Sequence, residues 1–199
     1  MKRIAIIGAT GFIGRNLIDA LLEQTDHHVI AVAPNVATLE KEHGRLTKIE
    51  GDVFSGDDME DALHNVDVAY YLVHMMKSRR NDFYEQEALA AKTFGSAAAK
   101  KGVGRVIYMS GLGNDDEELS QHLASRHNTG AILRSLCQHV IELRASMIIG
   151  EGSISFEIVR ALVKKLPLMT LPRWSKTLTQ PIGLNDALRY LIGALDLTS

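Results

Sequence analysis

The sequence has few of the features that would point to a secreted or membrane-bound protein. Cys137 is the one cysteine among 199 residues, so the chain can form no internal disulfide, as is usual in a reducing compartment. No segment approaches the roughly 20 apolar residues that cross a membrane, and the N-terminus has no long apolar region followed by a cleavage site of small residues. These absences favour a cytoplasmic protein that does not bind a membrane.

An excess of positive charge is also missing. The 22 Lys and Arg residues are scattered and are balanced by 24 Asp and Glu residues, which leaves a formal net charge of −2. No basic stripe carries interleaved aromatic side chains, so we expect no nucleic-acid partner. The histidines lack the spacing of metal ligands, and we expect no metal site. The composition is otherwise that of an ordinary soluble domain.

Short apolar runs alternate with longer stretches of helical periodicity from end to end. The runs predicted as strands are Arg3–Ile7, His28–Ala33, Leu46–Glu50, Val66–Val73, Val103–Ser110 and His139–Ser146. The stretches predicted as helices between them are Phe12–Gln24, Val36–His43, Asp57–His64, Asp82–Lys101 and Glu117–Leu136. Nearly continuous apolar strands joined by helices indicate right-handed βαβ units. We therefore expect an α/β fold with a doubly wound, mainly parallel Rossmann-type sheet and helices on both faces.

The pattern changes after Gly152. A predicted helix at Ile154–Lys165 is followed by a proline-bounded segment, Leu166–Trp174, and by a final helix at Asn185–Leu195. No linker or internal repeat divides the chain, so residues 1–199 are expected to form a single domain. Within it we expect a dinucleotide-binding core at residues 1–150 and a small substrate-side cap at residues 151–199.

A glycine-rich turn follows the first predicted strand and opens the first predicted helix. Its glycines have the spacing G-x-x-G-x-x-G, which suits a tight turn, close approach of the backbone to a pyrophosphate, and close packing of helix on strand. The free N–H groups and the dipole at the start of a helix favour the phosphate charge. We therefore expect NADP(H) or NAD(H) as the cofactor. The expected contacts at this turn are Gly8, Thr10, Gly11, Phe12, Ile13, Gly14 and Arg15.

Further motifs carry a resemblance to a known family. They are Gly8-Ala9-Thr10-Gly11-Phe12-Ile13-Gly14, Gly51-Asp52-Val53, Tyr70-Tyr71-Leu72-Val73-His74-Met75-Met76 and Pro172-Arg173-Trp174. The sequence resembles the atypical branch of the short-chain dehydrogenase/reductase superfamily, in particular the NmrA-like NAD(P)H-binding proteins of bacteria that are usually labelled nucleoside-diphosphate-sugar epimerases. The resemblance implies that Asp52 and Val53 lie beside the adenine, and that Leu72, Val73 and His74 contact the cofactor. It also implies a seven-stranded sheet in the order 3-2-1-4-5-6-7, from which we expect the last strand to be missing.

The catalytic positions depart from the pattern of that superfamily. Its active members use a Ser, a Tyr and a Lys four residues after the Tyr, where the Tyr passes the proton and the Lys holds the ribose. Ser110 matches the Ser, but His122 and Arg126 stand where the Tyr and the Lys are expected. His122 could act as the acid and Arg126 could hold the ribose hydroxyls. Alternatively, both residues only line the cleft or lie on a solvated helix face.

The choice of dinucleotide depends on the end of the second strand. NAD-specific domains carry an Asp or Glu about 20 residues past the glycines, which binds the 2′-hydroxyl of the ribose. This sequence has Val32-Ala33-Pro34-Asn35 at that place, without an acid and without the Arg of many NADP-binding relatives. Arg15, directly after Gly14, is the best remaining cation for a 2′-phosphate. The balance favours NADP(H).

Three functional hypotheses remain open at this stage. The first is an NAD(P)-dependent reductase of a small carbonyl or quinone substrate, with Ser110, His122 and Arg126 as the catalytic residues. The second is a non-catalytic redox sensor that binds NAD(P)H and acts through a regulatory protein partner. The third is a nucleoside-diphosphate-sugar epimerase or dehydratase, against which the absent Tyr argues.

Overall fold

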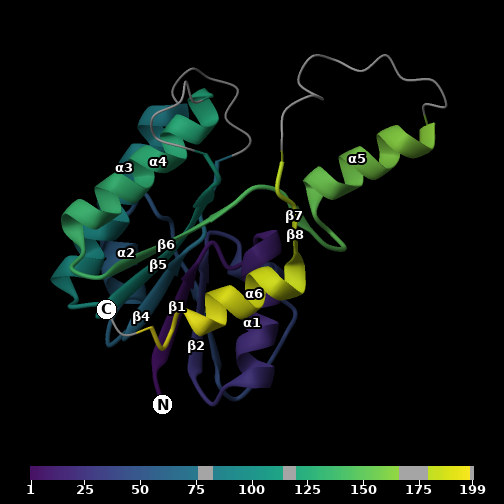
Figure 1. Ribbon diagram of the computed structural model, residues 1–199. Coiled ribbons are helices and arrows are strands. Elements are labelled where there is room, and N and C mark those ends of the chain that lie inside the picture. The colour runs from purple at the N-terminus through teal and green to yellow at the C-terminus, as the bar shows by residue number, and fades with distance from the viewer. Residues whose placement is uncertain (76–82, 114–119, 166–178, 198–199) are drawn as a thin grey trace.

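The computed structural model describes residues 1–75, 83–113, 120–165 and 179–197 (Figure 1). The strands are β1 Arg3–Ile7, β2 His28–Ala33, β3 Leu46–Glu50, β4 Val68–Tyr71, β5 Arg105–Gly111, β6 Val140–Ala145, β7 Ile148–Ile149 and β8 Ile182–Gly183. The helices are α1 Phe12–Gln24, the 3-10 helix η1 Val36–Thr38, α2 Gly56–Ala62, α3 Phe83–Lys100, α4 Gln121–Leu136, α5 Ile154–Lys165 and α6 Leu184–Gly193.

Strands β1 to β6 form one sheet in the order β3-β2-β1-β4-β5-β6, and every neighbouring pair is parallel. The predicted doubly wound α/β fold is therefore confirmed. The described residues add no seventh strand to this sheet; β7 and β8 instead pair with each other in a separate two-stranded sheet. The strand order reverses between β1 and β4, and ligands of open α/β sheets bind at the carboxyl ends of the strands beside such a reversal.

The two faces of the sheet bury two separate hydrophobic clusters. Because side chains of a strand alternate between faces, Ile6 and Tyr70 pack with α1 and α6, whereas Ile7 and Tyr71 pack with α2, α3 and α4. Figure 1 shows these helices in layers on either side of the sheet. On the second face the Tyr71 ring contacts the ring of Phe94 at a centroid distance of 4.8 Å. Buried aromatic and aliphatic side chains thus cover the strands on both faces.

Helix α6 packs into this core beside α1, although it comes from the segment predicted as a cap. The buried Tyr70 hydroxyl donates a hydrogen bond to the Leu191 carbonyl at 2.8 Å. Arg105 donates to the carbonyls of Ala194 and Leu195 just after the helix. Helix α5 stands farther from the sheet, beyond β7 and β8 (Figure 1). The division after residue 150 stays a prediction.

Two predicted elements differ from the structure. The expected helix at Val36–His43 is reduced to the single turn η1, because only Val36 and Leu39 in that stretch are buried and a short exposed helix is not stable by itself. Strand β4 ends at Tyr71, two residues before the predicted end, and the Leu72 N–H donates one more hydrogen bond to the Ile7 carbonyl at 2.9 Å. None of the described helices is long and apolar enough to cross a membrane.

Candidate functional site

The glycine turn between β1 and α1 has a conformation that demands glycine at two positions. Gly8 has φ +92°, and a Cβ there would lie 3.0 Å from the backbone carbonyl of Leu72. A Cβ on Gly14 would lie 2.5 Å from the Gly8 carbonyl oxygen, which is closer than any real contact. Both glycines therefore bring the start of α1, the end of β1 and the chain after β4 into close contact.

The start of α1 offers unpaired donors. Its N-cap is Gly11, which supplies no side-chain hydrogen bond, and its first turn contains no acidic residue. The N–H groups of Phe12 and Ile13 in the first turn therefore have no partner within the helix, and the helix dipole favours an anion at this end. The turn fits a dinucleotide pyrophosphate on these grounds.

Arg15 joins the glycine turn to the segment after β2. Its Nε donates to the Thr10 carbonyl at 2.9 Å, and its terminal nitrogens donate to the carbonyl and hydroxyl of Thr38 at 3.2 and 3.1 Å. The three acceptors are uncharged oxygens, so these contacts do not neutralise the guanidinium. The end of β2 is the side of a dinucleotide site where the adenosine ribose binds. Arg15 thus lies between the glycine turn and the segment after β2, and its contact with a cofactor stays a prediction.

The predicted adenine contacts after β3 differ from each other. Asp52 is exposed, and one of its carboxylate oxygens accepts the N–H of Phe54 at 3.0 Å in a local turn. The side chain of Val53 is buried in the core with Met59 of α2. An adenine could therefore reach the Asp52 carboxylate but not the Val53 side chain.

The predicted catalytic residues Ser110 and Arg126 both lie near the carboxyl end of β5. Arg126 of α4 donates from Nη2 to the carbonyl of Met109 at 2.9 Å. Among the described residues, neither the buried Ser110 hydroxyl nor the buried Arg126 Nε has a hydrogen-bond partner. The nearby Tyr108 phenol donates to the Arg126 carbonyl at 3.0 Å.

His122 lies in the first turn of α4. Its ring stacks on Phe83 at a centroid distance of 5.5 Å and meets the His74 ring edge to face at 4.6 Å. Partial burial of the ring lowers the pKa of His122, the positive charges of His74 and Arg126 lower it further, and Glu87 acts in the opposite direction. The structure therefore brings His122 together with His74, a residue predicted only as a cofactor contact.

A buried carboxylate that the sequence reading missed completes this region. Glu87 of α3 is 6% exposed, and its carboxylate accepts hydrogen bonds from His74, Met75 and Ser125. The sequence does contain a sign of this residue, because Glu87 stands at helical spacing from the apolar residues Ala90, Ala91 and Phe94, which are buried in the structure. An acid in the apolar stripe of a helix is rare unless it has partners. No group of His, Cys, Asp or Glu in the described parts of the chain is arranged to hold a metal ion.

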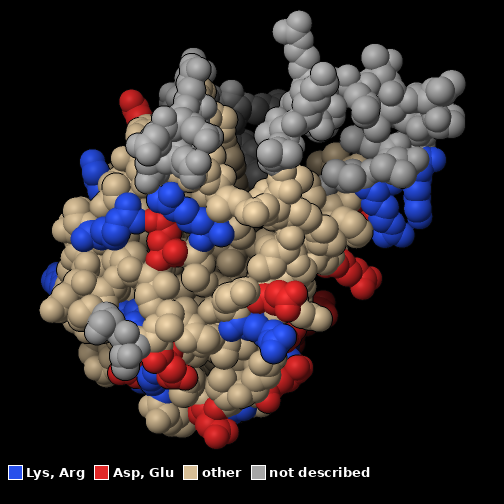
Figure 2. Space-filling model, viewed as in Figure 1, with Lys and Arg blue, Asp and Glu red and all other residues tan. Residues whose placement is uncertain are grey.

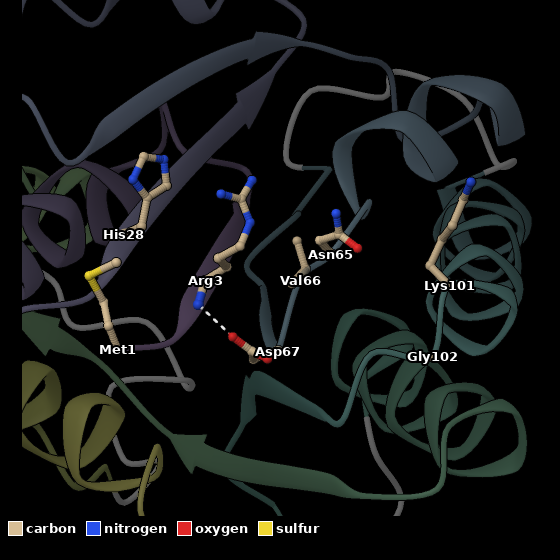
Figure 3. A pocket seen from close by; sticks show the side chains of 8 residues that line it. All are labelled: Met1, Arg3, His28, Asn65, Val66, Asp67, Lys101 and Gly102. Atoms are coloured by element: carbon tan, nitrogen blue, oxygen red, sulfur yellow. Dashed lines mark hydrogen bonds between the residues drawn. The ribbon is translucent and has the colours of Figure 1, made fainter.

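A surface hollow of about 570 Å³ lies at the opposite edge of the sheet (Figure 3). It includes Arg3 and His28, the first residues of β1 and β2, and the Arg3 N–H donates to the Asp67 carboxylate at 2.7 Å. Its lining residues are Met1, Arg3, His28, Asn65, Val66, Asp67, Lys101 and Gly102. These residues are at the amino ends of the strands or in the turns before them, so the hollow is not part of the dinucleotide site.

The face of the molecule in Figure 2 shows positive and negative side chains interspersed over an otherwise uncharged surface. Such a mixture produces no strong field of one sign on that face.

The sequence is similar to those of several known proteins. The chain is 24% identical over 123 residues to the auxiliary protein GraX of Staphylococcus aureus (strain NCTC 8325 / PS 47). The matched stretch covers 60% of this chain and 39% of GraX. It is 22% identical over 226 residues to a UDP-glucose 4-epimerase of Vibrio cholerae, covering 98% of this chain and 67% of that protein. The chain thus spans less than half the length of GraX.

A solved structure with the same fold is a short-chain dehydrogenase/reductase of Veillonella parvula DSM 2008 in complex with NADP. It superposes with a TM-score of 0.71 at 20% sequence identity and covers 100% of this chain and 88% of that chain. The family model described as NAD(P)H-binding matches residues 8–161, which is more than half of the sequence. The chain therefore belongs to the NAD(P)H-binding family that this model describes.

Proposed function

We propose that this protein is a reductase that uses NAD(P)H, with a preference for NADPH, to reduce a small carbonyl or quinone substrate. The observation that carries the proposal is the pair of buried, unpartnered polar atoms at the end of β5, the Ser110 hydroxyl and the Arg126 Nε. A buried polar atom without a hydrogen bond costs about 1–3 kcal/mol. Two such atoms at the carboxyl edge of the sheet indicate hydrogen bonds that a ligand completes.

Each residue has a role that follows from its chemistry. When bound, the reduced nicotinamide supplies a hydride to the substrate carbon. The Ser110 hydroxyl donates a hydrogen bond to the substrate oxygen, and His122 gives that oxygen the proton that completes the alcohol. Arg126 keeps its positive charge, donates to the ribose hydroxyls and passes no proton. Since the pKa of His122 is lowered, the reduction rate falls as pH rises through that pKa.

The test is the decay of NADPH absorbance with a panel of carbonyls and quinones. We expect His122→Phe to lose about 10²–10⁴-fold in rate, the usual contribution of general acid catalysis, with nearly normal cofactor binding. Ser110→Ala is expected to lower the rate and to leave binding intact. His139→Gln removes an exposed imidazole just before β6 and serves as the control. Unchanged rates in both site variants would remove these residues from the chemistry.

A second candidate function is a sensor of NAD(P)H that acts through a protein partner without turnover. It is favoured by the replacement of the proton-passing Tyr and its Lys by His122 and Arg126. The sensor predicts no acceptor reduction by any variant and changes in cofactor affinity alone. The same replacement argues against a sugar-nucleotide epimerase, which would need the Tyr.

A further inference from the structure

Three elements converge on one carboxylate beside the proposed acid. His74, three residues past the end of β4, has its Nδ1 at 3.0 Å from Glu87 Oε1, and the Met75 N–H donates to the same oxygen at 3.3 Å. The Ser125 hydroxyl of α4 donates to Glu87 Oε2 at 2.6 Å. Both oxygens of the carboxylate are therefore held in place by hydrogen bonds.

Glu87 is ionised in this setting. Burial by itself raises the pKa of this carboxyl, but the hydrogen bonds from His74, Ser125 and Met75 outweigh it, and the net result is a lowered pKa. The ionised carboxylate accepts the hydrogen bond from His74 Nδ1 and so fixes the orientation of the ring.

The His74 ring is also fixed against His122. The two ring centroids are 4.6 Å apart in an edge-to-face arrangement, and Phe83 stacks on the other side of His122. Two imidazolium charges at this distance repel each other, so protonating one ring disfavours protonating the other. Besides His74 itself, the charged groups that act on the His122 ring are Glu87 of α3 and Arg126 of α4.

We propose that Glu87 and His74 form a positioning dyad for His122, in which Glu87 orients the His74 ring through Nδ1 and that ring lies edge to face against His122. The charges of the two dyad residues act in opposite directions on the affinity of His122 for a proton. The effect of the dyad on reaction rate rests on the proposed reductase, whereas its effect on the protonation of the His122 ring does not. His74 and Glu87 act here through His122, and neither needs to touch the substrate. Ser125 belongs to the dyad because it holds the second oxygen of Glu87.

The opposite signs of the two charges provide a test that does not depend on turnover. NMR titration of the histidine rings in the 199-residue chain is expected to show a lowered pKa for His122. In His74→Gln this pKa rises, because a positive neighbour is lost, whereas in Glu87→Gln it falls further, because a negative neighbour is lost. His139→Gln should leave it unchanged. A purely structural role would not move the two variants in opposite directions.

The rate profile gives the second readout. If the reductase is active, the pH at which its rate falls by half follows the pKa of His122. This pH therefore moves up in His74→Gln and down in Glu87→Gln, and a shift of one pKa unit is a tenfold change in proton concentration. An active wild type whose profile is unchanged in both variants overturns the dyad alone. A wild type that reduces no acceptor overturns the reductase, and the ring titration still decides whether the dyad exists. If Glu87→Gln does not fold, an unaltered His122 titration in His74→Gln overturns the dyad.

Discussion

Gly14 lies so close to Gly8 that a Cβ atom on Gly14 would be 2.5 Å from the Gly8 carbonyl oxygen and 2.8 Å from that of Ala9. These neighbours are backbone atoms of the same turn, so they can move aside only if the turn itself changes. The first prediction is that Gly14→Ala destabilises the fold by about 1–3 kcal/mol, the usual cost of overpacking. Urea unfolding followed by circular dichroism measures this loss. A variant as stable as the wild type would contradict the close packing of α1 on the turn.

Gly11 gives the complementary variant. A Cβ at this position would have a single neighbour, the Gly8 carbonyl oxygen at 3.3 Å, and the backbone there is extended. We expect Gly11→Val to fold, but its branched side chain would occupy the place of the pyrophosphate above the first turn of α1. Fluorescence titration with NADPH should therefore show a large loss of affinity. Normal affinity in the folded variant would place the cofactor elsewhere.

The fold was largely predictable because its signals are local. Strands β1, β2 and β3 and helices α1 and α5 have the predicted bounds, since each is an apolar run or a helical pattern with clear ends. Helix α2 begins after Ser55, whose side chain accepts the Asp58 N–H as an N-cap. The stretch from residue 36 to 43 was an exception, because the pattern continued there but burial did not, and β4 is shorter than its predicted run.

The candidate site was predictable only in part. The glycine turn and Arg15 were found because their spacing is set within one βα unit. The dyad of Glu87 and His74 joins residues 13 positions apart on different elements, and Ser125 comes from 38 positions beyond Glu87. The packing of α3 against α4 brings Glu87 and Ser125 together, whereas His74 comes from the chain after β4, and no local pattern encodes these contacts. The predicted helix start at Glu117 lies outside the described residues; α4 begins at Gln121, capped by Ser120.

Arg15 allows a test of cofactor choice. If the guanidinium meets the 2′-phosphate, Arg15→Ala should weaken NADP(H) binding by about 1.5–3 kcal/mol, the value of a hydrogen bond to a charged group, and should leave NAD(H) binding little changed. Calorimetric titration of both cofactors measures the difference. Arg160→Ala, which removes an exposed arginine of α5, is the matched control. An equal loss for both cofactors would mean that Arg15 contacts only the groups that they share.

The last prediction concerns stability and pH. Burial is the largest cause that lowers the pKa of His27, His28 and His122 below the ordinary value of 6.5, and neighbouring positive charges contribute at each site. In the window just below 6.5 the unfolded chain therefore binds more protons than the folded protein, so stability is full above this window and is lost as pH falls through it.

We expect the urea midpoint to be lower at about pH 5.5 than at about pH 7.5, where free histidines are neutral. His122→Gln should reduce this dependence, because it removes one of the three groups. His139→Gln should not, since the exposed His139 imidazole is the control for loss of a ring. The prediction is contradicted if the urea midpoint is the same at the two pH values, or if it changes as much in His122→Gln as in the wild type. The His122 ring would then be protonated as readily in the folded protein as in the unfolded chain.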